Sequence, residues 1–238
     1  MQRSAIIIGA STGIGAAVAN RLSAKGWTLG LMARSTDTLH ALAEALPGPC
    51  YVQTIDLRNH ETALSGLQQL WTAMGGVHLV WGNAGINHLF PSPDQTDEVI
   101  RVNVLGLVGC LEWAREQMLA QGHGHIAATT SIASIRGSGP SPVYGGTKAF
   151  LVNYLEGLAK QAYKRQQPLT VTDIRPGYIA TSMTQGQKGL FWLEDLDKAA
   201  DQIVHALEKQ KRVAYIMPRW RLIALLMRFF PWWMYRKV

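Results

Sequence analysis

The side chains best suited to chemistry in this sequence are a tyrosine, a lysine and a serine that precedes them. Tyr144 and Lys148 are four residues apart, so on a helix they share one face. An ammonium beside a phenol favours the phenolate, so we expect the pKa of Tyr144 to lie below its ordinary value of about 10. Such a tyrosine can transfer a proton near neutral pH. Ser131, thirteen residues before Tyr144, adds a hydroxyl to this group.

The N-terminal segment has the pattern of a phosphate-binding turn. The apolar run 5–8 predicts a buried strand, and Gly9, Gly13 and Gly15 follow it before a helical pattern begins. Glycines let the backbone approach a phosphate closely, and the free N–H groups at a helix start attract its charge. The spacing Gly-x-x-x-Gly-x-Gly differs from the common dinucleotide fingerprint, and a plain glycine-rich turn is the alternative interpretation.

Together these motifs resemble the short-chain dehydrogenase/reductase family over about residues 3 to 185. The resemblance also rests on Asn83-Ala84-Gly85 and Pro176-Gly177, and on the interval between the serine and the tyrosine. It implies catalytic roles for Asn103, Ser131, Tyr144 and Lys148. It also implies a nicotinamide dinucleotide held by Gly9, Ser11, Thr12, Gly13, Ile14, Gly15, Arg34, Ser35, Asp56, Leu57, Asn83, Ala84, Gly85, Tyr144, Lys148, Pro176, Gly177, Ile179 and Thr181.

The resemblance assigns a task to each catalytic side chain. Tyr144 donates a proton to the carbonyl oxygen, and Ser131 positions that oxygen by a hydrogen bond. Lys148 lowers the pKa of Tyr144 and holds the nicotinamide ribose, while Asn103 holds a water that links Lys148 to solvent. Ser134 is an alternative to Ser131, which we prefer because its interval to the tyrosine matches the family.

The residues after the second expected strand indicate which dinucleotide is used. An acid at this position would bind the adenosine ribose hydroxyl and repel a 2′-phosphate, but the sequence has Arg34 and Ser35 there. An arginine can bind a phosphate by charge-assisted hydrogen bonds. We therefore predict NADP(H) as the cofactor and prefer it to NAD(H). The alternative is that Arg34 is a solvated loop residue.

Alternating apolar strands and amphipathic helices predict an α/β protein. We expect strands at 3–8, 28–33, 50–54, 77–82, 125–130, 169–174 and 213–217, and helices at 14–25, 36–46, 62–74, 95–121, 142–166 and 197–208. This alternation indicates a Rossmann-like, doubly wound parallel sheet of about seven strands with helices on both faces. The resemblance implies the strand order 3-2-1-4-5-6-7. Ligands of such sheets lie beyond the carboxyl ends of the strands.

Length and charge indicate one domain with a basic tail. The chain has 238 residues and a net charge of +7, but residues 209–238 hold eight Lys/Arg and no acid. The remaining residues carry nearly balanced charges, so the basicity belongs to the tail and does not favour a nucleic-acid partner. We divide the chain into a catalytic domain at 1–218 and a basic, tryptophan-rich, amphipathic helical tail at 219–238.

The tail and its surroundings suggest a location and partners. An apolar helix flanked by tryptophan and arginine is typical of segments that lie in a membrane interface. Packing on a partner subunit or forming a funnel for an apolar substrate are the alternatives, and the family implies a homodimer or homotetramer. No apolar run reaches the ~18 residues of a membrane span, and no secretory signal is visible. We expect a cytoplasmic protein, or one peripheral at the inner face of a membrane.

Two further features complete the predicted site. The loop 182–196 should cover the substrate, because it contains two glycines and two aromatic residues, Gly186, Gly189, Phe191 and Trp192. These aromatics favour an apolar or lipid-like carbonyl or alcohol substrate, although they could simply pack on the next helix. We predict no metal, because the histidines at 88, 123 and 125 are more typical of a turn and a solvated edge.

The predicted function is a reductase or dehydrogenase that interconverts a ketone or aldehyde and an alcohol. One alternative is the reductase half of an epimerisation of a lipid-linked sugar. Another is a nucleotide-sensing or membrane-surface protein without catalysis. A complete Ser131, Tyr144, Lys148 and Asn103 set weighs against a sensor, which has no need of a tuned acid.

Overall fold

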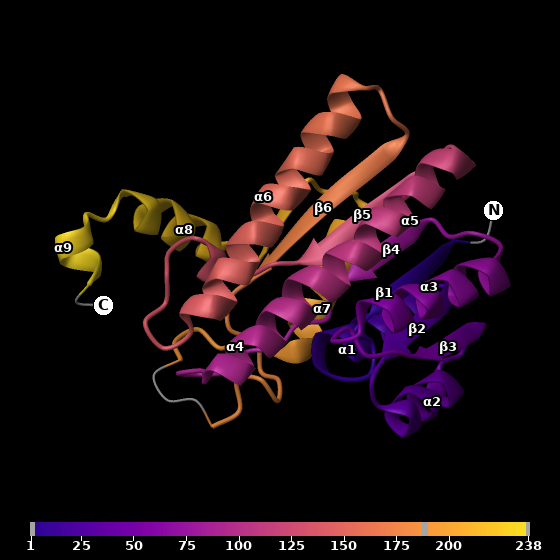
Figure 1. Ribbon diagram of the computed structural model, residues 1–238, viewed down its shortest axis with the longest axis horizontal. Helices are drawn as coiled ribbons and strands as arrows, with labels where there is room; N and C mark the ends of the chain where they lie inside the picture. The colour runs from indigo at the N-terminus through magenta and orange to yellow at the C-terminus, as the bar shows by residue number, and fades with distance from the viewer. Residues whose placement is uncertain (1–2, 187–189, 237–238) are drawn as a thin grey trace.

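A parallel sheet forms the centre of the molecule. The computed structural model describes residues 3–186 and 190–236. Its seven-stranded sheet has the order β3-β2-β1-β4-β5-β6-β7, which confirms the predicted fold class and strand order (Figure 1). The strands are β1 (Ser4–Ile8), β2 (Thr28–Ala33), β3 (Cys50–Thr54), β4 (Leu79–Gly82), β5 (Gly124–Thr129), β6 (Leu169–Pro176) and β7 (Val213–Ile216).

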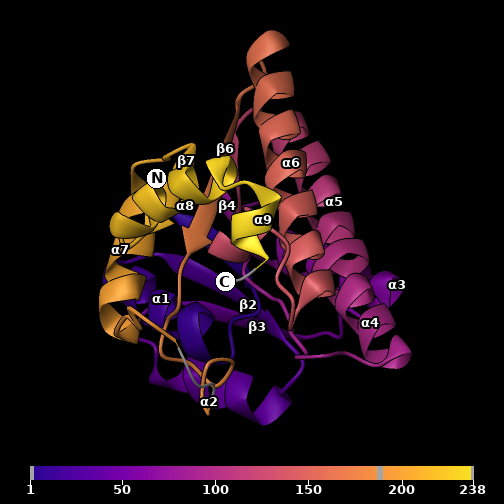
Figure 2. The ribbon, with the colours of Figure 1, turned by 90° about the vertical axis from the view of Figure 1, so that its left-hand side faces the viewer.

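Helices cover both faces of the sheet, as Figure 2 shows. One face packs against α1 (Gly13–Ala24), α2 (Thr36–Ala45) and α7 (Leu196–Glu208), and the other against α3 (His60–Met74), α5 (Leu107–Gln121) and α6 (Pro142–Lys164). Successive residues of a strand point to opposite faces, so Ile7 of β1 lies in one core cluster and Ile6 and Ile8 in the other. Burial on both faces explains why β1 is uniformly apolar.

The long helix expected at 95–121 contains a change of helical type. It begins as α4 (Pro93–Ile100), where Ser92 and Gln95 form a capping box, and it ends as α5. Between them a π-helical segment, η1, spans Arg101–Gly106 and carries Asn103. Such π-helical turns are rare, occur mostly inside α-helices and are frequently found at functional sites. The sequence pattern predicted the helix but not this turn.

The C-terminal tail forms two helices at the end of the molecule that carries the carboxyl ends of the strands (Figure 1). These are α8 (Arg219–Phe229) and α9 (Trp232–Tyr235). Trp220 and Ala224 of α8 are each 2% exposed and pack with Ile132 and Met217. None of the described helices has the length and apolar character needed to cross a bilayer.

Candidate active site

A cavity of about 560 Å³ lies at the edge of the sheet where β1, β4, β5 and β6 end. Its volume is in the range that suits a small-molecule ligand. Eighteen of the nineteen residues predicted to hold the cofactor line this cavity, and the exception is Gly15. The lining also includes residues that the sequence did not single out, among them Asn87, His88, Glu98 and Thr129.

The glycine-rich turn is packed too closely for side chains. Gly9 has a φ of +90°, and a Cβ placed on it would lie 2.6 Å from the backbone N of Ala84. A Cβ on Gly15 would lie 2.0 Å from the carbonyl oxygen of Gly9, so this glycine brings α1 against the turn instead of facing the cavity. The first turn of α1 contains no acid, and the Thr12 side chain does not cap it. The turn and helix start therefore fit the phosphates of a dinucleotide.

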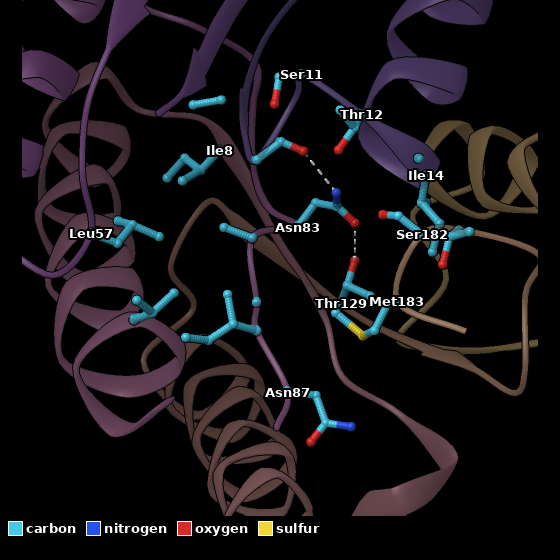
Figure 3. A pocket seen from close by; sticks show the side chains of 18 of the residues that line it. Ile8, Ser11, Thr12, Ile14, Leu57, Asn83, Asn87, Thr129, Ser182 and Met183 are labelled. Atoms are coloured by element: carbon cyan, nitrogen blue, oxygen red, sulfur yellow. Dashed lines mark hydrogen bonds between the residues drawn. The ribbon is translucent and has the colours of Figure 1, made fainter. Parts of the chain in front are cut away.

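Asn83 links the glycine-rich turn to the end of β5. Its Nδ2 donates to the carbonyl oxygen of Gly9 at 2.9 Å, and its Oδ1 accepts from the hydroxyl of Thr129 at 3.0 Å (Figure 3). The Thr129 hydroxyl in turn accepts from the indole N–H of the buried Trp81 at 3.1 Å. These bonds hold the ends of β1, β4 and β5 in a fixed arrangement around the cavity.

The predicted catalytic side chains Ser131, Tyr144 and Lys148 all line the cavity. The Nζ of Lys148 donates to the carbonyl oxygen of Thr129 at 2.8 Å and lies 5.7 Å from the centre of the Tyr144 ring. The Ser134 hydroxyl donates to the carbonyl oxygen of Ser131 at 2.7 Å, so it is engaged with the backbone. This geometry favours Ser131 over Ser134 as the serine of the site.

The expected direction of the Tyr144 pKa is wrong in this structure. Burial raises the pKa of Tyr144, and a side-chain hydrogen bond with Ser131 opposes this only in part. Burial lowers the pKa of Lys148 to about 8, although the nearby charge of Asp173 raises it. Of these two groups, the lysine is the one whose charge changes closer to neutral pH, and the tyrosine stays protonated there.

Asn103 lies behind the cavity wall. It is fully buried in η1, where its Nδ2 donates to the carbonyl oxygen of Ile86 at 2.9 Å and its Oδ1 accepts from the Ile86 N–H at 2.8 Å. A Cβ on Gly85 would lie 3.1 Å from the Nζ of Lys148 and 3.4 Å from the Oδ1 of Asn103. A side chain at position 85 would therefore crowd both the lysine amine and the Asn103 amide.

Charged residues surround the end of the cavity that carries Arg34. This arginine is exposed and lines the cavity beside Ser35 and Asp56. Asp56 accepts from the Nε of Arg58 at 2.8 Å, and the hydrogen bonds from Arg58 lower its pKa despite partial burial. Arg58 was not predicted as a site residue, because its pairing with Asp56 depends on the fold of the loop after β3.

A buried ion pair beneath the site was also missed. In β6 the Oδ2 of Asp173 lies 2.5 Å from the Nη2 of Arg175, and these two side chains are 5% and 7% exposed. The Oδ1 of Asp173 accepts from the Thr130 hydroxyl at 2.6 Å, and Arg175 donates to the Tyr215 hydroxyl at 3.1 Å. Thr130 lies between Thr129, whose carbonyl oxygen binds Lys148, and Ser131, so the pair supports the chain segment at the end of β5 that carries the serine of the predicted site.

The histidine interpretation was wrong at one position. His125 is 4% exposed within β5, where its Nε2 lies 2.8 Å from the Thr172 hydroxyl, and burial lowers its pKa to about 4. His123 is exposed, as expected, and His88 lies 3.1 Å from Glu98. Among the described residues, no three His, Cys, Asp or Glu side chains gather in a way that could hold a metal.

The described part of the loop 182–196 packs mainly on the tail. The ring centres of Phe191 and Trp192 lie 5.2 Å and 5.7 Å from the ring centre of Trp220. The ring centre of Tyr178 lies 5.6 Å from it. The backbone of Glu194 bonds to Tyr178 and Ala180, which ties the loop to the segment after β6. Gly186 has a positive φ of 77°, and Gly189 lies outside the described residues.

The model of the short chain dehydrogenase family matches residues 3–189. This chain belongs to that family. A Staphylococcus haemolyticus protein described as an uncharacterized oxidoreductase is 30% identical over 89% of the chain and 93% of its own length. A human 3-oxoacyl-[acyl-carrier-protein] reductase is 29% identical over 79% of the chain and 80% of its own length.

A solved structure shows the same arrangement. An alcohol dehydrogenase from the archaeon Thermococcus sibiricus, complexed with 5-hydroxy-NADP, superposes with a TM-score of 0.78 at 25% identity. The match covers 90% of this chain and 95% of that one. The present protein is therefore an oxidoreductase with a nucleotide-binding Rossmann fold, of the dehydrogenase/reductase class.

Proposed function

We propose that this enzyme is an NADP(H)-dependent reductase that interconverts an apolar ketone or aldehyde and the corresponding alcohol. The proposal rests on one observation. Ser131, Tyr144 and Lys148 line the same cavity as the glycine-rich turn. A binding protein would need the turn but not a half-buried tyrosine beside a buried lysine. The reverse oxidation uses the same groups, and the direction in the cell depends on the substrate.

The chain's own residues divide the work of binding. Gly9, Gly13 and the start of α1 would bind the phosphates, and Asp56 with Leu57 would contact the adenine. Pro176 and Thr181 lie in the segment that would enclose the nicotinamide. This group supplies or accepts hydride when bound. Because Lys148 lines the same cavity, its ammonium is available to the nicotinamide ribose.

The proton required by the reaction would come from Tyr144. Its hydroxyl is the proposed acid for the carbonyl oxygen, and Ser131 would orient that oxygen by a hydrogen bond. The raised pKa keeps the tyrosine protonated and able to donate at neutral pH. Lys148 would supply positive charge beside the tyrosine phenolate that remains. Asn103 would hold a water that links Lys148 to solvent, and a proton would return to the phenolate by this route.

The preference for NADP(H) rests on Arg34. It lines the cavity with Ser35 immediately after β2, where an acid would otherwise select NAD(H). Its exposure leaves the guanidinium available to a 2′-phosphate, which it can bind by a fork of two hydrogen bonds. The nearby Asp56 is already paired with Arg58, which reduces its repulsion of a phosphate.

An apolar substrate is supported by the loop after β6. Phe191, Trp192 and Leu193 are 50%, 42% and 49% exposed, and they follow the segment that borders the catalytic cavity. An exposed apolar cluster of this kind marks a surface that binds an apolar molecule. The relation to a human reductase of 3-oxoacyl chains agrees with a carbonyl carried on an aliphatic chain.

Assembly and location complete the proposal. Enzymes of this family are commonly oligomeric, and we propose a homodimer or homotetramer. Phe150 of α6 is 47% exposed and stacks on Tyr154, which gives this helix an apolar outer surface suited to a subunit contact. We also propose a cytoplasmic enzyme that is peripheral at the inner face of a membrane.

The proposal is tested by NADPH consumption with methyl ketones of increasing chain length, in parallel with NADH. We expect turnover with NADPH that improves with chain length, because the exposed apolar surface of the loop gains contacts with a longer chain. Turnover that is equally fast with NADH would contradict the cofactor preference. NADPH binding without turnover on any carbonyl would contradict the enzymatic proposal.

A further inference from the structure

The helix α8 has two apolar faces, and only one of them is covered by the protein. The inner face contains Trp220 and Ala224, which are buried. The outer face contains Leu222, Leu225, Leu226 and Phe229, which are 61%, 53%, 48% and 78% exposed. These four positions follow the i, i+3, i+4, i+7 spacing of one helical stripe. An amphipathic helix normally buries such a stripe, so this one has an unmatched apolar surface.

The helix α9 continues the apolar surface. Trp232 and Trp233 are 68% and 61% exposed and begin three residues after the exposed Phe229. The outer face of the tail is defined here as Leu222, Leu225, Leu226, Phe229, Trp232 and Trp233. Figure 1 shows α8 and α9 at the edge of the molecule, with no other labelled element beyond them, and Figure 2 views the molecule from that side. Tryptophan and leucine beside basic residues are typical of a helix that lies in a membrane interface.

The charge of the tail indicates what covers the outer face. Arg221, Arg228 and Arg236 are exposed around it, and residues 209–238 contain no acid that could pair with them. A second copy bound through the same face would bring arginine opposite arginine, because a two-fold interface places one patch against itself. Anionic lipid headgroups attract these arginines instead. With eleven residues, α8 is too short to span a bilayer and can lie along its surface.

The inner face attaches the tail to both loops that border the active site. Trp220 packs so closely on Gly177 that a Cβ there would lie 2.0 Å from the indole nitrogen. Arg136, in the loop after Ser131, donates to the carbonyl oxygens of Met227 and Phe230 at 3.0 Å and 2.8 Å.

A third bond strengthens this attachment. The Tyr235 hydroxyl donates to the carbonyl oxygen of Gly137 at 2.8 Å, and the Arg136 guanidinium lies 4.4 Å from the centre of the Tyr235 ring. The site and the outer face are therefore held together through α8 and α9.

We propose that the outer face of the tail docks this enzyme on an anionic lipid surface, so that the apolar substrate enters the site from the bilayer. The docking itself is independent of the reaction, whereas the delivery of substrate rests on the proposed function. Because α8 connects the lipid surface to the loops at positions 132–140 and 177–186, the opening to the site would lie close to the membrane.

The experiment measures flotation of the full chain with vesicles of phosphatidylcholine alone and with added phosphatidylglycerol. We expect binding to the mixed vesicles that weakens at high salt and is much lower with phosphatidylcholine alone. Replacing Arg221 and Arg228 by glutamine should reduce binding about 30-fold, because each arginine near an anionic surface contributes roughly fivefold to the binding constant. Leu225→Gln with Phe229→Gln should abolish it. The control Tyr163→Gln changes an exposed aromatic side chain on α6, outside the outer face of the tail, and should bind like the wild type.

Activity separates docking from catalysis. All of these variants should reduce a short, water-soluble ketone at the wild-type rate, while the outer-face variants lose turnover of a long-chain ketone held in vesicles. Vesicle binding that survives both double substitutions would overturn the proposal. So would concentration-dependent assembly that the outer-face variant abolishes, without vesicle binding, because it would assign the face to a second copy. Lipid binding without turnover of any ketone would overturn the proposed function and the delivery step, while docking would stand.

Discussion

Removing the charge of Asp173 should destabilise the enzyme more than any surface change. Its carboxylate lies 2.5 Å from the guanidinium of Arg175, and both side chains are almost completely buried. In Asp173→Asn the Arg175 guanidinium keeps its charge but loses its negative partner. The asparagine amide has a shape similar to that of the carboxylate it replaces. Breaking a buried ion pair on one side costs about 3–5 kcal/mol, because an uncompensated charge stays in the interior.

This loss corresponds to a large shift in thermal stability. For a chain of this size, each kcal/mol moves the melting temperature by about 2–4 °C, so we expect a decrease of roughly 6–20 °C. Asp173→Asn combined with Arg175→Met should recover much of it, since the buried charge is then gone from both sides. In this double variant the Tyr215 hydroxyl loses its hydrogen bond from Arg175. Because Tyr215 is only partly buried, its hydroxyl can bind water instead.

The assay is urea unfolding, followed by fluorescence and circular dichroism, for both variants and a matched control. Asp97→Asn removes one charge from the ion pair with Arg101, whose two side chains are 59% and 52% exposed. An exposed pair of this kind contributes about 0–1 kcal/mol. The reasoning would be refuted by an Asp173→Asn variant that is no less stable than Asp97→Asn, or by a double variant no better than the single one.

Three other predictions concern the cofactor, pH and packing. Arg34→Ala should weaken NADPH binding by about 10- to 100-fold, because a charge-assisted hydrogen bond is lost. NADH binding should be nearly unchanged, and equal losses for the two cofactors, measured by titration, would contradict this. Because burial lowers the pKa of Lys148 to about 8, its ammonium is present below that pH, and kcat/KM should fall as pH rises through it. Lys148→Arg should remove this alkaline decrease, and a decrease that persists would assign it to another group. Gly177→Ala should lower stability by about 1–3 kcal/mol, since its Cβ meets Trp220, whereas Gly157→Ala in α6, with open space, should not.

The sequence was sufficient for the architecture because its signals were local and repeated. Apolar β-branched strands alternate with amphipathic helices, and this pattern admits few arrangements other than a parallel sheet. The motif residues Gly9, Asn83 and Tyr144 follow strand ends or lie on the helix after them, so the sheet brings them to one edge. That edge was predictable because parallel strands all end on the same side.

Features that depend on tertiary contacts were not predictable. The pair of Asp173 and Arg175 is two residues apart on β6, a spacing that in sequence looks like any polar alternation. The direction of the Tyr144 pKa depends on burial, which outweighs its neighbours. His125 was expected at a solvated edge because glycine precedes it, but β5 lies inside the sheet and buries its ring. In each case the environment of the side chain decides its chemistry.

The most direct test of the proposed chemistry is the rate of ketone reduction with NADPH in the wild type, Tyr144→Phe and Tyr163→Phe. Tyr144 lines the cavity, whereas Tyr163 is 87% exposed at the far end of α6 and serves as the control. We predict that Tyr144→Phe lowers kcat by roughly 10²–10⁴-fold and weakens NADPH binding far less than that, and that Tyr163→Phe behaves as the wild type. Reduction at the wild-type rate by Tyr144→Phe would contradict the account.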